Sequence, residues 1–269
     1  MVMKVVKNRL KTNSYRNIKK SFPRFLSLLI MSLLGVFVYA GLQATSPDML
    51  KTLDNYYDKY NTYDIKVIST LGLTDNDITS LKKISNIKDI EGINSIDTLI
   101  KVNKKDLVLN VTSLPKDINK LKVISGRLPS KENEIVIENN MLKENNLHLG
   151  DTINLANSNF NNEEAKIVGT IESTLYFNNV STSPGRGSTN IGTGKINYYS
   201  YMLKANFNQD YLTGIYLTVK NAKKEITSSD EYDTLVNAAS KKIESIKKTQ
   251  EESRYKELYN DTSLEISNK

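Results

Sequence analysis

The sequence contains no cysteine, a single histidine and no acidic residue before Asp48. Without cysteine the chain forms no disulfide and offers neither a thiolate metal site nor a cysteine nucleophile. The lone His148 lies between Leu147 and Leu149, and a metal site or a base–nucleophile pair would need partners for it. We therefore predict no catalytic residue, no metal ligand and no cofactor, which means no enzyme, and we expect a structural or exposed role for His148.

The absence of early acids locates the net charge. The chain carries 37 basic and 30 acidic residues, a net charge of +7. Eight basic residues precede Asp48, which leaves 29 basic against 30 acidic residues, a net charge of −1, in the rest of the chain. That balance does not favour phosphate contacts, so we expect no nucleic-acid partner. The eight basic residues are Lys4, Lys7, Arg9, Lys11, Arg16, Lys19, Lys20 and Arg24.

An uncharged apolar stretch runs over residues 25–44. About 20 residues in a helix cross about 30 Å of hydrocarbon. Ser27 and Ser32 are tolerable there because their hydroxyls can bond back to the helix backbone. A packing face of small residues for partner helices and ordinary span composition both remain open. A cleaved signal peptide is the main rival, but the basic region and the apolar run are both longer than such peptides carry. We predict an uncleaved transmembrane helix over residues 25–44.

Residues 1–24 form a basic cytoplasmic segment. Val6, Leu10, Ile18 and Phe22 fall on a four-residue stride, which predicts an amphipathic helix in the headgroup layer of an anionic leaflet. A merely solvated basic tail is the alternative. Pro23 is expected to mark a change of direction before the span. The positive-inside rule places this end in the cytoplasm and the rest of the chain outside. The membrane-flanking basic residues are Arg16, Lys19, Lys20 and Arg24.

Beyond the span, short periodic segments predict an α+β domain over residues 45–229. Several closely spaced strands indicate a small barrel-like β subdomain over about residues 122–172. From Asp230 the pattern is helical, which predicts a long stalk helix over residues 230–269. The expected elements are helices over 45–60, after Thr74 and around Met141, and strands over 63–69, 96–102, 107–111, 134–138, 165–172 and 211–220.

Residues 173–209 are rich in Ser, Thr, Gly, Asn and Tyr, and a loop of this length is usually functional or mobile. Its candidate contacts for a partner or substrate are Arg186, Lys195, Tyr198 and Tyr199, although solvated loop charge would also explain the two basic residues. Gly194-Lys195 resembles part of a phosphate-binding loop, but Ile196 replaces the required hydroxyl, so we exclude an ATPase. The clustered tyrosines, Tyr56, Tyr57, Tyr60, Tyr63, Tyr198, Tyr199 and Tyr201, would suit an apolar or sugar ligand, or ordinary packing and membrane-edge anchoring.

Four ordered segments resemble the N-terminal portion of MacB/FtsX-type ABC transporter permeases, in particular the large Gram-positive members. They are the entry into the span at 16–42, the Gly-Arg-x-Pro turn and Asn-Glu-Ile strand within 124–138, the Leu-Gly-Asp and Val-Gly strand pair within 147–173, and the glycine-rich loop at 186–199. Each motif alone is weak, but together they cover nearly the whole chain in family order.

The resemblance implies a MacB-type extracytoplasmic core domain between the first and second spans of a plasma-membrane protein. It also implies a separate cytoplasmic ABC ATPase, the remaining permease spans and a possible homodimer as partners. Family members of this kind pass motion between ATP hydrolysis and export or signalling outside. A complete permease has at least four spans, and this chain has one, so we expect a fragment, a truncated product or half of a split permease. The alternative function is a free-standing membrane-anchored extracellular binding or adhesion module.

Overall fold

The computed structural model describes residues 9, 12–17, 19–176 and 186–267. The chain divides into two compact units, residues 1–53 and residues 54–269. Three of the residues that define the predicted amphipathic helix, Val6, Leu10 and Ile18, lie outside the described residues. The four membrane-flanking basic residues are described, and Arg16, Lys19, Lys20 and Arg24 are all exposed.

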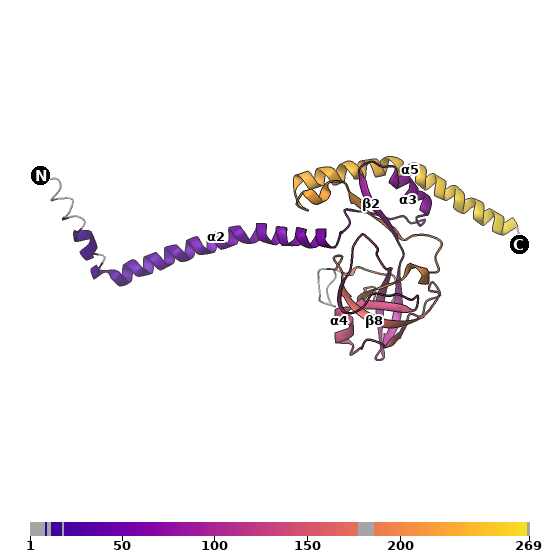
Figure 1. Cartoon of the computed structure of the whole chain (residues 1–269), viewed down its shortest axis with the longest axis horizontal. Coiled ribbons are helices and arrows are strands. Elements are labelled where there is room, and N and C mark those ends of the chain that lie inside the picture. Colours follow the sequence, from indigo (N-terminus) through magenta and orange to yellow (C-terminus); the bar gives the residue numbers. More distant parts are fainter. Residues whose placement is uncertain (1–8, 10–11, 18, 177–185, 268–269) are drawn as a thin grey trace. The chain divides into compact units, whose positions relative to one another are not determined.

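Helix α2, Phe22–Lys59, contains the predicted span and continues through the predicted helix at 45–60 (Figure 1). Among the described residues it is the one helix long and apolar enough to cross a membrane. Pro23 stands at its second position, where a proline costs little because the first amides of a helix have no intrahelical partner. Ser27 and Ser32 donate to the carbonyl oxygens of Pro23 and Leu28, both at 2.9 Å, as predicted.

A three-stranded antiparallel sheet has the order β1-β10-β2, formed by β1 (Ile65–Val67), β10 (Gly214–Val219) and β2 (Ile87–Ile93). Helix α3, Asp75–Lys82, begins after Thr74, as predicted, and the Thr74 backbone amide donates to the Asp77 carboxylate at 2.8 Å, as in a capping box. Helix α5, Asp230–Ser267, lies beside α3 and β2 in Figure 1. Its apolar side packs on the buried Ile215 and Leu217 of the central strand.

The larger sheet is mixed and has the order β3-β4-β9-β6-β8-β5, with β7 also paired to β8. Strand β9 runs parallel to β4 and antiparallel to β6, and β6 runs parallel to β8. The short helix α4, Asn139–Glu144, follows β6 directly. The strands are β3 (Ser95–Val102), β4 (Lys105–Ser113), β5 (Lys122–Gly126), β6 (Glu134–Glu138), β7 (Thr152–Asn154), β8 (Glu164–Glu172) and β9 (Tyr198–Met202).

Two short 3₁₀ turns flank β10. They are η2, Lys204–Asn206, and η3, Ala222–Lys224. The sheet's main core lies under β3, β4, β6, β8 and β9 and includes Leu109, Ile135, Ile167 and Met202, all fully buried. These residues come from four strands that are far apart in the sequence, so this core forms only when the whole sheet is assembled.

The barrel-like subdomain predicted for 122–172 is not what the structure shows, because the sheet is open. Its strands also come from a wider stretch of the chain, from Ser95 to Met202. Near one edge the Thr98 hydroxyl donates to the Leu155 carbonyl oxygen. No strand pairing joins β3 to β7 among the described residues, so this side-chain bond does not close a barrel.

Gly169 of β8 lies where two stretches of backbone approach each other closely. The β6–β8 register skips one residue beside it, which is a bulge. A Cβ on Gly169 would lie 2.9 Å from the Ser125 carbonyl oxygen and closer still to that of Arg127. Only a glycine lets β5 and the turn after it pack against β8 here.

Replacing Gly169 with alanine should therefore destabilise the fold by about 1–3 kcal/mol, because backbone must move to admit the methyl group. Urea unfolding of the full chain, followed by circular dichroism, measures the change. Gly214→Ala is the matched strand control, since its Cβ would meet Ile93 at an ordinary 3.4 Å. Equal stability of Gly169→Ala and wild type would contradict the packing argument.

Candidate functional site

The four residues predicted to form a partner-binding loop do not lie together in an exposed loop. Tyr198 and Tyr199 belong to β9 and are 5% and 2% exposed. Arg186 is also buried, whereas Lys195 is exposed, in a short bridge with Ser188. The prediction of one long loop over 173–209 is wrong for this reason: β9 fills a central position in the sheet. Any contact of these residues with a partner stays a prediction.

Arg186 is held by a buried carboxylate. Its Nε donates to Glu138 Oε2 at 3.0 Å, and its terminal nitrogen forms an ion pair with Oε1. The guanidinium also lies over the Tyr198 ring, 5.7 Å from the centroid. Burial raises the pKa of Glu138, and Arg186 opposes that shift by stabilising the charged form. These contacts fix the segment after residue 185 to the end of β6, which is a structural role.

The Gly-Arg-x-Pro turn and the Asn-Glu-Ile strand also form a structural clamp. The Arg127 guanidinium donates to both oxygens of Glu134, at 2.7 and 2.6 Å. The Ser130 amide adds a third bond to this carboxylate at 2.8 Å. Arg127 is the main cause that holds the pKa of Glu134 far below its usual range. Gly126 takes a φ of +72°, which a residue with a side chain rarely adopts.

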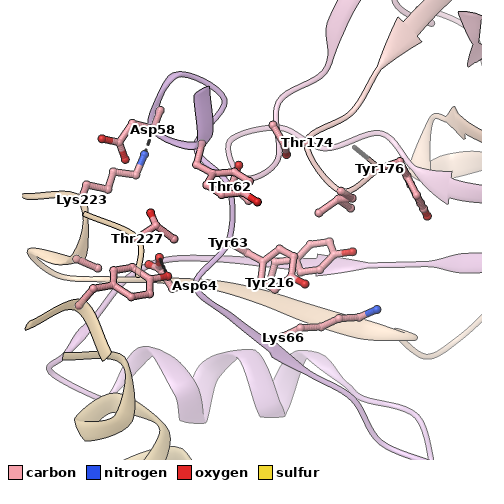
Figure 2. Close-up of a pocket in the computed structure, with 14 residues that line it drawn as sticks. Asp58, Thr62, Tyr63, Asp64, Lys66, Thr174, Tyr176, Tyr216, Lys223 and Thr227 are labelled. Carbon is pink, nitrogen blue, oxygen red and sulfur yellow. Dashed lines mark hydrogen bonds between the residues drawn. The ribbon is translucent and has the colours of Figure 1, made fainter. Parts of the chain in front are cut away.

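A concave pocket of about 450 Å³ is the candidate functional site (Figure 2). It lies wholly within the unit 54–269. Its walls come from the end of α2, from β1 and the residues before it, from residues 174–176 after β8, from β10 and η3, and from the start of α5. The lining residues are Tyr57, Asp58, Thr62, Tyr63, Asp64, Lys66, Thr174, Leu175, Tyr176, Tyr216, Ala222, Lys223, Thr227 and Tyr232.

One side of the pocket is aromatic. Tyr63 stacks on Tyr216 with ring centroids 4.7 Å apart, and Tyr176 stacks on Tyr199 at 4.2 Å. Figure 2 shows Tyr63, Tyr216 and Tyr176 on the side away from Lys223. Burial raises the pKa of Tyr176 to about 12, so the phenol stays protonated at neutral pH. Neutral, immobilised rings present apolar faces together with hydroxyl groups.

The opposite side is polar and tightly bonded. Asp64 accepts hydrogen bonds from the Val219 amide at 2.6 Å and from the Tyr232 hydroxyl at 2.8 Å. Burial raises the pKa of Asp64, and these two bonds oppose the shift. Lys223 donates to the Asp58 carbonyl oxygen at 3.3 Å (Figure 2), and burial lowers the pKa of its ammonium. This side therefore joins α2, β1, β10 and α5 through charged groups.

Two threonines of the pocket lining have buried hydroxyl groups. Among the described residues, neither Thr62 Oγ1 nor Thr174 Oγ1 has a hydrogen-bond partner, although both atoms are buried. Leaving a buried polar group without a hydrogen bond costs about 1–3 kcal/mol. Thr174 is 3% exposed as a whole residue.

Only part of this site is visible in the sequence. Tyr57 and Tyr63 belong to the tyrosine cluster for which a ligand was considered, but the polar side was missed. His148 is exposed beside Asp151, as expected. No group of three or more His, Asp or Glu residues that could hold a metal occurs in the part of the chain that the structure describes. A non-enzymatic role stays a prediction.

No protein-family model matches the chain, and a search of curated proteins returned no match. Solved structures do match. The extracellular domain of YknZ, a noncanonic ABC-type transporter of Gram-positive bacteria, is 14% identical with a TM-score of 0.39, over 63% of this chain and 85% of that one. The periplasmic region of MacB from Actinobacillus actinomycetemcomitans is 14% identical with a TM-score of 0.37, over 69% and 84%. These neighbours are outer domains of the kind of permease that the sequence motifs resemble. With TM-scores below 0.5, no function is transferred from them.

Replacing Arg186 with methionine should destabilise the fold by about 3–5 kcal/mol, because it leaves the buried Glu138 carboxylate without its cation. The double variant Arg186→Met/Glu138→Gln should recover most of that loss. Thermal unfolding of the full chain measures both. Lys195→Met, at an exposed position in the same segment, should change stability by no more than about 0.5 kcal/mol. A wild-type transition for Arg186→Met would show that the pair is not needed.

The clamp also predicts a dependence of stability on pH. Since the folded-state pKa of Glu134 is lowered, its stabilisation is fully present above its unfolded value of about 4.3 and is lost as the pH falls toward the folded value. Glu134→Gln should lower stability at neutral pH and flatten its fall between about pH 5 and pH 2. Urea midpoints across that range test this, with exposed Glu163→Gln as control. Parallel curves for Glu134→Gln and wild type would contradict it.

Proposed function

We propose that this chain is the membrane-anchored extracytoplasmic portion of an ABC transporter permease. In this role it couples a cytoplasmic ATPase to export or signalling outside the membrane. The observation that carries the proposal is helix α2. Its apolar side chains are exposed, and it follows the basic segment 1–24. Leu28, Phe37 and Leu42 are each more than 65% exposed. An exposed apolar surface of this extent has to be shielded from water. A lipid bilayer shields an uncharged helical segment of this length.

The ordered family motifs support the assignment to a permease. The Gly-Arg-x-Pro and Asn-Glu segments form one clamp, in which Arg127 binds Glu134 and the Lys166 amide donates to the Asn133 carbonyl oxygen at 2.8 Å. The Leu-Gly-Asp segment leads into β7 and the Val-Gly segment lies in β8. The motifs thus coincide with contacts between strands, so their order along the chain belongs to one architecture.

The end of α2 offers a route for coupling. Asp54 accepts hydrogen bonds from the Thr227 amide at 2.8 Å and from its hydroxyl at 2.7 Å, just before α5 begins. Asn61 donates to the Asp117 carbonyl oxygen at 2.6 Å. Asp54 belongs to the helix that contains the predicted span, and Asn61 follows that helix by two residues, so these are the residues through which a shift of the span would act on the unit 54–269 under this proposal. The second long helix, α5, would then transmit such a shift back toward the membrane.

The alternative, a free-standing anchored binding module, is favoured by the pocket, one side of which is lined by tyrosine rings. The two functions differ in their partners, since only a permease portion needs an ATPase. They share the topology, with residues 1–24 cytoplasmic and the unit 54–269 outside a plasma membrane. Possible partners in the first case include further permease spans and a second copy of this chain.

Two measurements test the proposal on the tagged full chain in its host membranes. Protease added to intact cells should digest the unit 54–269 and leave a protected N-terminal fragment. Crosslinking followed by purification in mild detergent should recover an ABC ATPase. The double variant Leu29→Arg/Val36→Arg should lose membrane insertion, because each central charge costs about 2.5–3.5 kcal/mol.

Ser32→Leu is the matched control, because it changes the same helix without adding charge and should insert normally. Full protection of the unit 54–269 from external protease would refute the topology. Correct topology without recovery of any ATPase would refute the permease and support the binding module.

A further inference from the structure

Strand β5 forms one end of the larger sheet, and no strand pairs with its outer edge in the part of the chain that the structure describes. All five of its residues are exposed, so both faces of the strand are open to solvent. The strand at the other end, β3, has alternating buried residues and a bond from Thr98 to the Leu155 carbonyl oxygen. The outer edge of a terminal strand presents N–H and C=O groups without partners, and an added strand pairs with such groups.

Large apolar side chains are exposed in β5 and just after it. Val123 and Ile124 are each 40% exposed, and Leu128 is 38% exposed. Val123 pairs with Ile171, which is fully buried in the smaller core of this sheet. Val123 therefore lies at the border of a buried apolar surface. A strand added to β5 would extend both the ladder of hydrogen bonds and that surface.

The edge is already ordered, and its geometry suits a short partner segment. Ser125 and Thr170 share a hydrogen bond between their hydroxyls at 2.7 Å, and the Arg127 amide donates to the Val168 carbonyl oxygen at 3.0 Å. An ordered edge loses little conformational freedom on binding. The register with β8 shifts at Ile124, which forms a bulge, and a bulge interrupts the regular spacing of a strand. The matching segment is therefore short and extended.

The charge of the edge distinguishes between possible occupants. Residues 118–131 include no acidic residue and four basic ones, which are Lys120, Lys122, Arg127 and Lys131. Glu172 pairs with Lys122 and Glu134 pairs with Arg127, so two of the four positive charges remain in excess. Two copies of β5 side by side would bring these like charges together, which is unfavourable. An acidic segment would instead meet opposite charge, which favours its encounter with this edge.

We propose that β5 is a docking edge for a short, extended, acidic segment of a partner protein. This segment adds a strand to the larger sheet and packs against Val123, Ile124 and Leu128. The proposal goes beyond the proposed function and does not depend on it, because such pairing needs neither an ATPase nor further spans.

Binding of labelled synthetic peptides to the full chain in phosphatidylcholine nanodiscs, followed by fluorescence anisotropy, tests the proposal. The probe is Glu-Thr-Val-Glu-Val-Thr-Glu. One comparison peptide replaces each Glu by Lys, and the other replaces each Val by Pro, which has no amide donor and cannot form the ladder. The probe should bind with a Kd of about 1 mM or less, and about tenfold more tightly than either comparison peptide.

Ile124→Lys should weaken binding of the probe about tenfold, because it places a charge in the apolar part of the edge. Leu99→Lys is the matched control, because Leu99 is 42% exposed on β3 at the opposite end of the sheet. Both variants replace exposed residues and should fold, which circular dichroism verifies. The double variant Lys120→Glu/Lys131→Glu, which leaves the apolar residues unchanged, should also weaken the probe about tenfold and should favour the lysine peptide.

Four outcomes would overturn the proposal. They are no binding of the probe at about 1 mM, wild-type affinity of both Ile124→Lys and the double glutamate variant, equal binding of the proline peptide, and a dimer in analytical ultracentrifugation that Ile124→Lys dissociates. Equal binding of the proline peptide would mean that charge alone attracts the probe. Such a dimer would mean that a second copy of this chain occupies the edge.

Discussion

The pairing of β9 with β4 on one side and β6 on the other is the constraint on which the larger sheet depends. It unites strands from 95–113 with strands from 134–172. Asn197 begins the register, because its side chain accepts from the Val108 amide at 2.7 Å and its amide donates to the Val108 carbonyl oxygen at 2.9 Å. Alternation along β9 then sends Tyr198 to the main core and Tyr199 to the opposite face.

Local patterns predicted the parts of this fold that local physics decides. The hairpin of β3 and β4 turns at Asn103 and Lys104, both with positive φ, as two-residue hairpins require. Strand β6 falls on the predicted residues because its apolar run is bounded by the clamp and by α4. Strand β9 was missed because its residues, YYSYM, resemble the polar tyrosine-rich loop around them. Its strand identity comes from partners far away in the sequence, and one sequence does not show them.

The candidate site also has a part that local sequence patterns predict and a part that depends on long-range strand pairing. The tyrosines before β1 were visible as a cluster, and Tyr57 and Tyr63 do line the pocket. Tyr216 and Tyr232 reach it from β10 and α5, more than 150 positions later, so only the assembled sheet brings them in. The charged side was not visible either, because Asp64 looks like any solvated acid until Val219 and Tyr232 bond to it. Long-range strand pairing therefore decided both the fold's centre and the pocket's chemistry.

The pocket and the proposed coupling route share their residues. Asp58 is in the last turn of α2, and Tyr232 is in the first turn of α5. Lys223 bonds to the end of α2, and Asp64 links β1 to both β10 and α5. A ligand held among these groups would alter the free energy of any movement between α2 and α5. Because such coupling is reciprocal, a movement between the two helices that the ligand favours would in turn raise the affinity for that ligand by the same factor at equilibrium.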